Sequence, residues 1–331
     1  MPAAALALAA GFTCLVAILA ACAPDGARAP HPASAEKRSP EQRNAACEGC
    51  HAAEAREWRG SLHAVAHTDP PYLRAFALEP LAFCTSCHGP EAPHLALGVA
   101  CITCHDQASA STGAGPGHAG RARSCESCHE FPFPESGALM QMTATEHRAS
   151  PYASTPCESC HMPRRPAERG ARARAVHGFA ASRDPTFLRR AAIASARREG
   201  SDVVITLRRG EVGHAFPTGD IFRRLRIVAD VGGAVVRCDA AAPASSVTRR
   251  EVVLARKTKS GEAADDRAFV RGDEARVTLD LHSLDGAESA TVRWAVCYER
   301  VGHPLDPNES NPSAAAIDGA VEIASGTLPG T

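Results

Sequence analysis

The stretch Cys101-Ile-Thr-Cys104-His105 decides the fold of this chain, because its spacing of two cysteines and a histidine occurs five times. The other copies are Cys47-Glu-Gly-Cys50-His51, Cys84-Thr-Ser-Cys87-His88, Cys125-Glu-Ser-Cys128-His129 and Cys157-Glu-Ser-Cys160-His161. Cys-x-x-Cys-His is the attachment motif of haem c, in which two thiols add to porphyrin vinyl groups and the histidine binds the iron. The sequence therefore predicts five covalently bound haem c groups, each with a proximal histidine from its own motif.

Zinc is the alternative metal for cysteine pairs at this spacing. A structural zinc site needs four ligands, which two Cys-x-x-Cys pairs together supply. Here the number of pairs is odd, and a histidine follows every pair. Free dithiols in an oxidising compartment would also tend to form disulfides. The motif favours haem over zinc and over disulfide bonds.

The N-terminus predicts export. Residues 3–21 carry no charge and end in Leu19-Ala20-Ala21-Cys22, which resembles the lipobox of bacterial lipoproteins. We therefore expect a signal peptide at 1–22, acylation of Cys22 and a flexible tether at 23–45. A retained transmembrane segment is the alternative, since the apolar stretch is just long enough to span a bilayer. The expected location is the periplasmic side of a membrane or the cell surface, and Ala23 favours the outer membrane.

Composition narrows the expected partners. The net charge of −1 gives no reason to expect nucleic acid. Aromatic residues make up only 5% of the chain, so the porphyrins themselves would supply much of the apolar interior. Five haems within residues 47–161 would lie nearly in contact, an arrangement suited to electron transfer between redox protein partners.

The chain is expected to be a multidomain α+β protein. A pentahaem cytochrome c domain of short helices and loops would cover residues 46–182. A bridging helix would follow at 183–200, with Asp184 as its cap, Pro185 in its first turn and Gly200 at its end. The remaining residues, 201–331, would form a C-terminal all-β, sandwich-like domain.

Alternating apolar residues predict the strands of that β domain. A period of two is typical of strands with one face buried, and several such runs favour a sandwich. The alternating positions are Val203, Ile205 and Leu207; Leu225, Ile227 and Ala229; Val277, Leu279 and Leu281; and Val292, Trp294, Val296 and Tyr298.

Cys238 and Cys297 are candidates for a disulfide in this domain. Cys297 alternates with the apolar positions of its run and shares the other face with Arg293 and Glu299. A bridge between the cysteines would therefore lie on the surface rather than in the core between two sheets. Both the bonded and the unbonded state stay open at this point.

Five segments carry a resemblance to the bacterial multihaem c-type cytochromes. They read CEGCH…EWRGSLHA, CTSCHGPEAPH, GVACITCHD, CESCHMP…HGF and GHAFPTGD, and the resemblance covers residues 45–235. The family includes the tetrahaem carrier of ammonia oxidisers and, more distantly, the haem cores of pentahaem nitrite reductase and hydroxylamine oxidoreductase. The resemblance implies that histidines placed like His63, His94, His118 and His177 are distal ligands of the irons. His214, in a turn with Pro and Gly, would either cap a haem or serve only that turn.

Two further patterns bear on distal ligation. His63 and His67 are four residues apart and would share one helical face near Trp58, with His63 the favoured ligand. In addition, Glu57-Trp-Arg-Gly-Ser-Leu-His63-Ala aligns with Glu146-His-Arg-Ala-Ser-Pro-Tyr152-Ala, so Tyr152 takes the place of His63. Either another histidine, His147 or His214, completes the set, or one iron is open beside Tyr152. We favour complete ligation by two histidines per iron.

The sequence thus favours an exported, membrane-tethered pentahaem c-type cytochrome that carries electrons. The alternative is a reductase of nitrite, hydroxylamine or a sulfur oxyanion at one open haem, although no motif reads Cys-x-x-Cys-Lys. A third hypothesis is an adhesive lipoprotein whose β domain binds a partner. The arginines between residues 164 and 174 are interpreted as a solvated loop or as partners of haem propionates, in preference to a docking face.

Overall fold

A computed structural model describes residues 38–105, 124–132, 139–166, 173–232, 235–239, 247–259, 262–302 and 316–330. Cys22, with the expected signal peptide and most of the tether, and His118 lie outside the described residues. In the part of the chain that is described, no helix combines the length and apolar character needed to cross a membrane.

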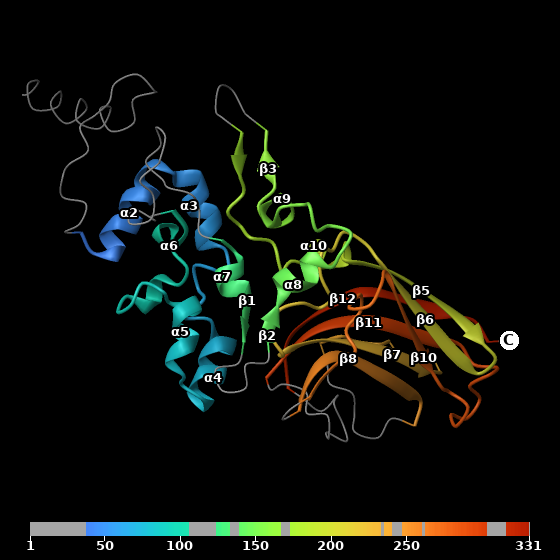
Figure 1. Ribbon diagram of the computed structural model, residues 1–331. Helices are drawn as coiled ribbons and strands as arrows, with labels where there is room; N and C mark the ends of the chain where they lie inside the picture. Colours follow the sequence, from blue (N-terminus) through green and yellow to red (C-terminus); the bar gives the residue numbers. More distant parts are fainter. Residues whose placement is uncertain are drawn as a thin grey trace, which may run out of the picture.

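Short helices and two small hairpins make up the described residues before position 185 (Figure 1). The helices are α2 (Pro40–Cys50), α3 (Ala52–Arg59), α4 (Pro70–Leu78), α5 (Ala82–His88), η2 (Leu95–Leu97), α6 (Cys101–His105), α7 (Glu126–His129), α8 (Thr143–Arg148) and α9 (Cys157–His161). The hairpins pair β1 (Glu130–Pro132) with β2 (Leu139–Met142), and β3 (Arg164–Arg165) with β4 (Arg174–Ala175).

The first described helix, α2, begins inside the segment that was predicted to be a flexible tether. Ser39 caps α2 through its side chain, and Gln42 closes a capping box by accepting from the backbone of Ser39. Pro40 occupies the first turn of the helix. Backbone N–H groups there have no partner within the helix, so proline loses no hydrogen bond. The flexible tether predicted to reach residue 45 therefore ends before Pro40.

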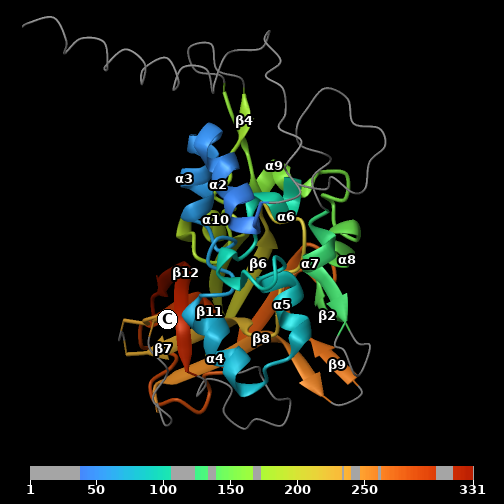
Figure 2. The ribbon, with the colours of Figure 1, turned by 90° about the vertical axis from the view of Figure 1, so that its left-hand side faces the viewer.

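Two antiparallel sheets form the second half of the chain. One has the order β10-β6-β5, from β10 (Glu274–Leu279), β6 (Asp202–Arg209) and β5 (Ala192–Glu199). The other has the order β12-β11-β7-β8-β9, from β12 (Ile317–Leu328), β11 (Val292–Val301), β7 (Arg223–Val231), β8 (Arg249–Lys259) and β9 (Glu262–Asp265). The helical segments gather on one side of these sheets in both views (Figure 1, Figure 2).

The alternating apolar residues of the two sheets meet in one core. Ile205 of β6, Ile227 of β7 and Val296 of β11 are fully buried there. All thirteen positions that the alternation singled out belong to this core. The two sheets therefore pack face to face as a sandwich, because this packing removes the apolar face of each sheet from water.

The predicted bridging helix is wrong over most of its length. Asp184 does cap a helix, accepting from the backbone of Phe187, but α10 spans only Pro185–Arg189. Residues 192–199 form β5, which pairs with β6 and turns its alternate alanines toward the core. Gly200, predicted as a helix end, has φ +65° and closes the turn between β5 and β6. Alanine and arginine favour helix locally, but pairing with β6 and burial of the alanine face in the main core outweigh that preference.

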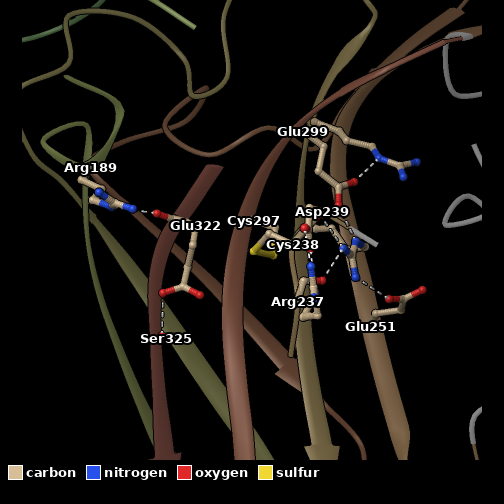
Figure 3. Close-up of a disulfide and its surroundings, with 11 residues drawn as sticks. Arg189, Arg237, Cys238, Asp239, Glu251, Cys297, Glu299, Glu322 and Ser325 are labelled. Carbon is tan, nitrogen blue, oxygen red and sulfur yellow. Dashed lines mark hydrogen bonds and ion pairs between the residues drawn. A yellow bond between two sulfur atoms is a disulfide. The ribbon is translucent and has the colours of Figure 1, made fainter. Parts of the chain in front are cut away.

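Cys238 and Cys297 form a disulfide, with their Cα atoms 5.3 Å apart (Figure 3). Cys297 faces away from the main core, as the alternation predicted. It is nevertheless fully buried, because the segment 235–239 covers this face and forms a second, smaller apolar cluster with it. The bridge therefore lies neither on the surface nor between the two sheets.

Candidate haem sites

Each motif lies on, or directly at the end of, one helical turn. The residues of α5, α6 and α9 include whole motifs, Cys125 directly precedes α7, and the first motif ends α2 with His51 as the following residue. Residues at i, i+3 and i+4 share one face of a helix. Both cysteines and the histidine of a motif therefore project to the same side, as two thioether bonds and one iron ligand on a single porphyrin require.

Two of the five motif histidines have a defined proton position. The Nδ1 atoms of His88 and His161 lie 2.8 Å from the carbonyl oxygens of Ala66 and Ala180. A carbonyl oxygen only accepts, so Nδ1 carries the proton and Nε2 keeps its lone pair. This orientation by a second hydrogen bond is typical of histidines that bind metals.

Three motif histidines face a second imidazole across a constant gap. The ring centroids are 6.2 Å apart for His129 and His63, 6.2 Å for His105 and His177, and 6.3 Å for His161 and His214. Two imidazoles on opposite sides of one iron have centroids about 6 Å apart, since each metal–nitrogen bond is about 2 Å and each nitrogen lies about 1 Å from its ring centre. The three pairs therefore fit irons bound by two histidines each.

The distal rings of these pairs are also prepared to bind. His177 and His214 each donate from Nδ1 to a carbonyl oxygen at 3.0 Å, that of Ala175 and of Ala215. Burial lowers the pKa of both His63 and His214 to about 4. Both imidazoles are thus neutral near pH 7, which is the form that binds a metal.

The remaining histidine candidates lie elsewhere. His94 forms an ion pair through Nδ1 with Glu41 of α2, the helix that ends in the first motif. In the neutral form of the ring, Nδ1 of His94 would donate to Glu41 and Nε2 would keep the lone pair that binds a metal. His147 lies beside Gly213, within the range of charge interaction with His214.

Tyr152 is hydrogen-bonded to the main chain of a distant segment. The hydroxyl donates to the carbonyl oxygen of Gly210 at 3.0 Å, and so ties the segment after α8 to the end of β6. His63 comes from a run of turns after α3 rather than from the helix that its spacing with His67 suggested. The ring of His67 contacts Tyr72 and Phe76, and it lies within range of charge interaction with the motif histidine His88.

The second motif has different surroundings. The ring of Tyr72 stacks on that of His88, with centroids 4.1 Å apart and planes 14° from parallel. The Tyr72 hydroxyl and Nδ1 of His67 are both buried and make no hydrogen bond to any described residue. Burial raises the pKa of this hydroxyl to about 12, so it stays protonated.

Side chains of all five motifs lie within interaction range of one another. Charge interactions link His51 with His105, Cys104 with Cys125, and His129 with both His88 and His161. Cys125 also contacts Cys157 directly. A continuous path therefore runs through the motif side chains, from the first motif by way of the third and fourth to the second and fifth.

Several residues of the site were not predicted. Phe179, at φ 48°, packs edge-on against His63 at 4.3 Å and also contacts His177. Arg174, interpreted from the sequence as part of a loop, binds Glu57, and its hydrogen bonds lower the pKa of that carboxyl to about 2. The alignment of Glu57 with Glu146 was the only signal in the sequence that could have singled out these carboxylates.

No protein-family model matches the chain, and no curated protein matches it. Among solved structures, the chain is similar to a penta-heme cytochrome c552 from Thermochromatium tepidum, with a TM-score of 0.57 and 19% sequence identity. The similarity covers 88% of this chain and 99% of that chain. The two chains share a fold, which in this chain is the mixed helical and antiparallel architecture described above.

Proposed function

We propose that this chain binds five haem c groups and transfers electrons between redox protein partners. The observation that carries the proposal is the set of three imidazole pairs with centroids 6.2 to 6.3 Å apart. Each pair joins a motif histidine to a histidine from a distant segment of the chain. An iron held by two imidazoles has no position open to substrate, and this is the ligation expected of an electron carrier.

The proximity of the motifs supports the same function. Bound haem iron would supply one-electron chemistry, while the protein would set ligation, spacing and insulation. Each motif has at least one side chain within interaction range of a side chain of another motif. Electrons could therefore enter at one motif and leave at another without a long gap.

We further propose that the protein is exported and held at a membrane through an acylated Cys22. Haem c is attached outside the cytoplasm, and the Leu19-Ala20-Ala21-Cys22 stretch supports lipid attachment. Weak, rapid docking to its electron donor and acceptor would suit such a tethered carrier.

Intact mass spectrometry and low-temperature EPR of the purified protein test the proposed function together. We expect a mass increment of five haems and low-spin signals from the three paired irons. Fewer than five haems in the wild-type protein would overturn the cofactor content. High-spin signals from most of the irons would overturn the carrier function.

A reductase with one open iron is the second candidate function, and the second motif favours it. His88 stacks against Tyr72, whose hydroxyl makes no hydrogen bond to the described residues, and His67 lies within range of charge interaction with His88. A buried phenol beside an open iron could donate a proton to a bound oxyanion. One high-spin iron together with turnover of nitrite, hydroxylamine or sulfite would support this candidate. A uniformly low-spin protein would exclude it.

A further inference from the structure

Two carboxylates at equivalent positions of the internal repeat make equivalent contacts. Glu57 lies in α3 and Glu146 in α8, and each is followed by arginine at the second position and serine at the fourth. Their side chains are shielded from solvent, with 16% and 6% of the side-chain surface exposed. A buried carboxylate is costly unless hydrogen bonds and a cation compensate for lost water, and both have these partners.

Glu57 reaches a segment more than a hundred residues away. Its two oxygens accept from Nη1 and Nη2 of Arg174, each at 2.8 Å, in a bidentate pair. One oxygen also accepts from the backbone N–H of His177 at 2.9 Å. The carboxylate therefore holds the main chain of the residue whose ring faces His105.

Glu146 does the same for the turn that carries His214. Its Oε2 accepts from the backbone N–H of Ala215 at 3.3 Å and from the hydroxyl of Thr218 at 2.6 Å. Its Oε1 accepts from Nη2 of Arg267 at 2.6 Å, and Arg267 in turn donates to the carbonyl oxygen of Pro217 at 3.1 Å. The carboxylate and its arginine thus hold both ends of the turn.

We propose that Glu57 and Glu146 are positioning residues that fix the distal ligands His177 and His214 opposite their motif histidines. The inference rests on the proposed function, since it treats these two histidines as ligands of iron. The repeat thus supplies two copies of one device, in which a helix carboxylate and an arginine hold the backbone at a ligand that arrives from a distant segment. The same device need not hold His63, which belongs to the first copy of the repeat itself.

A merely structural ion pair would have different consequences. Replacing such a carboxylate would lower stability without altering one particular iron. A positioning role instead predicts that the ligand field of the iron bound by His105 and His177, or by His161 and His214, changes while the other irons keep theirs. EPR g values and midpoint potentials separate the two roles.

The test uses Glu57→Gln and Glu146→Gln in the full-length holoprotein. The matched control is Glu54→Gln, whose carboxylate lies 3.6 Å from Arg174 on the same helix as Glu57, and a remote control is Glu199→Gln, which pairs with Arg197 on the surface. Neither control carboxylate accepts a hydrogen bond from residue 177 or from residues 214–218, all of which the structure describes. His177→Ala and His214→Ala assign the EPR signals to their irons.

We expect each glutamine variant to keep five haems by intact mass and to shift the g values and potential of its assigned iron alone. The control variants should leave the g values and the midpoint potentials unchanged. Wild-type spectra in both glutamine variants, or equal shifts in the controls, would overturn the positioning role. A wild-type protein with fewer than five haems would count against the proposed function and not against this inference.

A milder variant covers the case in which Glu146→Gln does not fold. Thr218→Val removes one hydrogen bond to the carboxylate and leaves the charges in place. We expect a smaller shift of the signal assigned through His214→Ala. An unchanged signal in Thr218→Val would overturn the role of Glu146.

Discussion

At the residue scale, His63 shows how ligand identity would set the properties of one iron. Its ring faces His129 at 6.2 Å and is packed by Phe179, so its position is fixed from two sides. The low pKa of His63 keeps the imidazole neutral and available to a metal.

Replacement of His63 by methionine should change the reduction potential of one of the five haems. A thioether is a weaker donor than imidazole and raises the reduction potential of haem iron. We expect His63→Met to raise the midpoint potential of one haem and to leave the potentials of the others unchanged. Spectroelectrochemical titration measures these potentials. His282→Met is the control, because His282 lies exposed in the sandwich beside Asp280. Five unchanged potentials in His63→Met would show that His63 binds no iron.

A second residue-scale prediction concerns Glu299 on the covered face of the five-stranded sheet. Its carboxylate binds Nε of Arg224 at 2.8 Å and Nε of Arg226 at 2.6 Å, and all three side chains are almost fully buried. Loss of one partner from such a group leaves buried charge without its counter-charge. We expect Glu299→Ala to lower the free energy of unfolding by about 3–5 kcal/mol in urea titrations.

The control for Glu299→Ala is Glu199→Ala. Glu199 pairs with Arg197 on the surface, where both side chains are about half exposed and water screens the pair. Such pairs contribute less than about 1 kcal/mol. Similar losses of stability in the two variants would contradict the distinction between buried and exposed pairs.

At the scale of elements, the disulfide holds the segment 235–239 over one face of β7 and β11. Cys238 and Cys297 are 59 residues apart, so the bond closes a long loop in the unfolded chain. In the chain-entropy view this restriction contributes about 4 kcal/mol, with about 2–4 kcal/mol typical of measured cases. The bridge faces away from the main core, and therefore away from the residues that join the two sheets.

Removal of the disulfide should lower the stability of the sandwich without changing the ligation of the irons. We expect the double variant Cys238→Ser, Cys297→Ser to lose about 2–4 kcal/mol of unfolding free energy, measured by circular dichroism in urea. Its haem spectra should match those of the wild type, which serves as the reference in the same titration. An unchanged unfolding midpoint would argue that the bond does not form.

The elements also show what the sequence could predict. The strands with apolar residues at every second position, such as Ile205 and Leu207, were predicted because one buried face leaves a local pattern. β5 was mistaken for helix, since its inward residues are small alanines whose role depends on pairing with β6. β12 was missed for a related reason, because Gly319 and Gly326 leave its alternation weak.

For the candidate site too, local sequence patterns predicted some residues and could not predict others. The proximal histidines were predicted because each follows its cysteines directly. His177 and His214 were named as candidates, but their pairing with the motif histidines His105 and His161 was not predicted, since a pairing across the fold leaves no local trace. Glu57 and Arg174, which lie far apart in the chain, are joined only by the fold.

At the scale of the whole molecule, apolar burial is divided unevenly between its two halves. Every member of the main core lies at Leu188 or later. Before that position, the buried apolar side chains of the described residues are Ala55, Ala100, Ile102 and Ala144. Four small or medium side chains cannot offset the entropy of ordering this many residues. The helical half must therefore obtain its apolar interior from bound haem.

Haem removal should consequently unfold one half of the molecule and spare the other. We expect the chain produced without haem attachment to lose residues before about 185 to limited proteolysis, while a fragment containing the sandwich and its disulfide survives. Mass spectrometry of the digest identifies the boundary, and the holoprotein under the same conditions should resist cleavage. The order of loss follows from burial, because proteases cut the segments with the least apolar surface to protect them. Equal resistance of both halves in the apoprotein would mean that the helices fold without their cofactors.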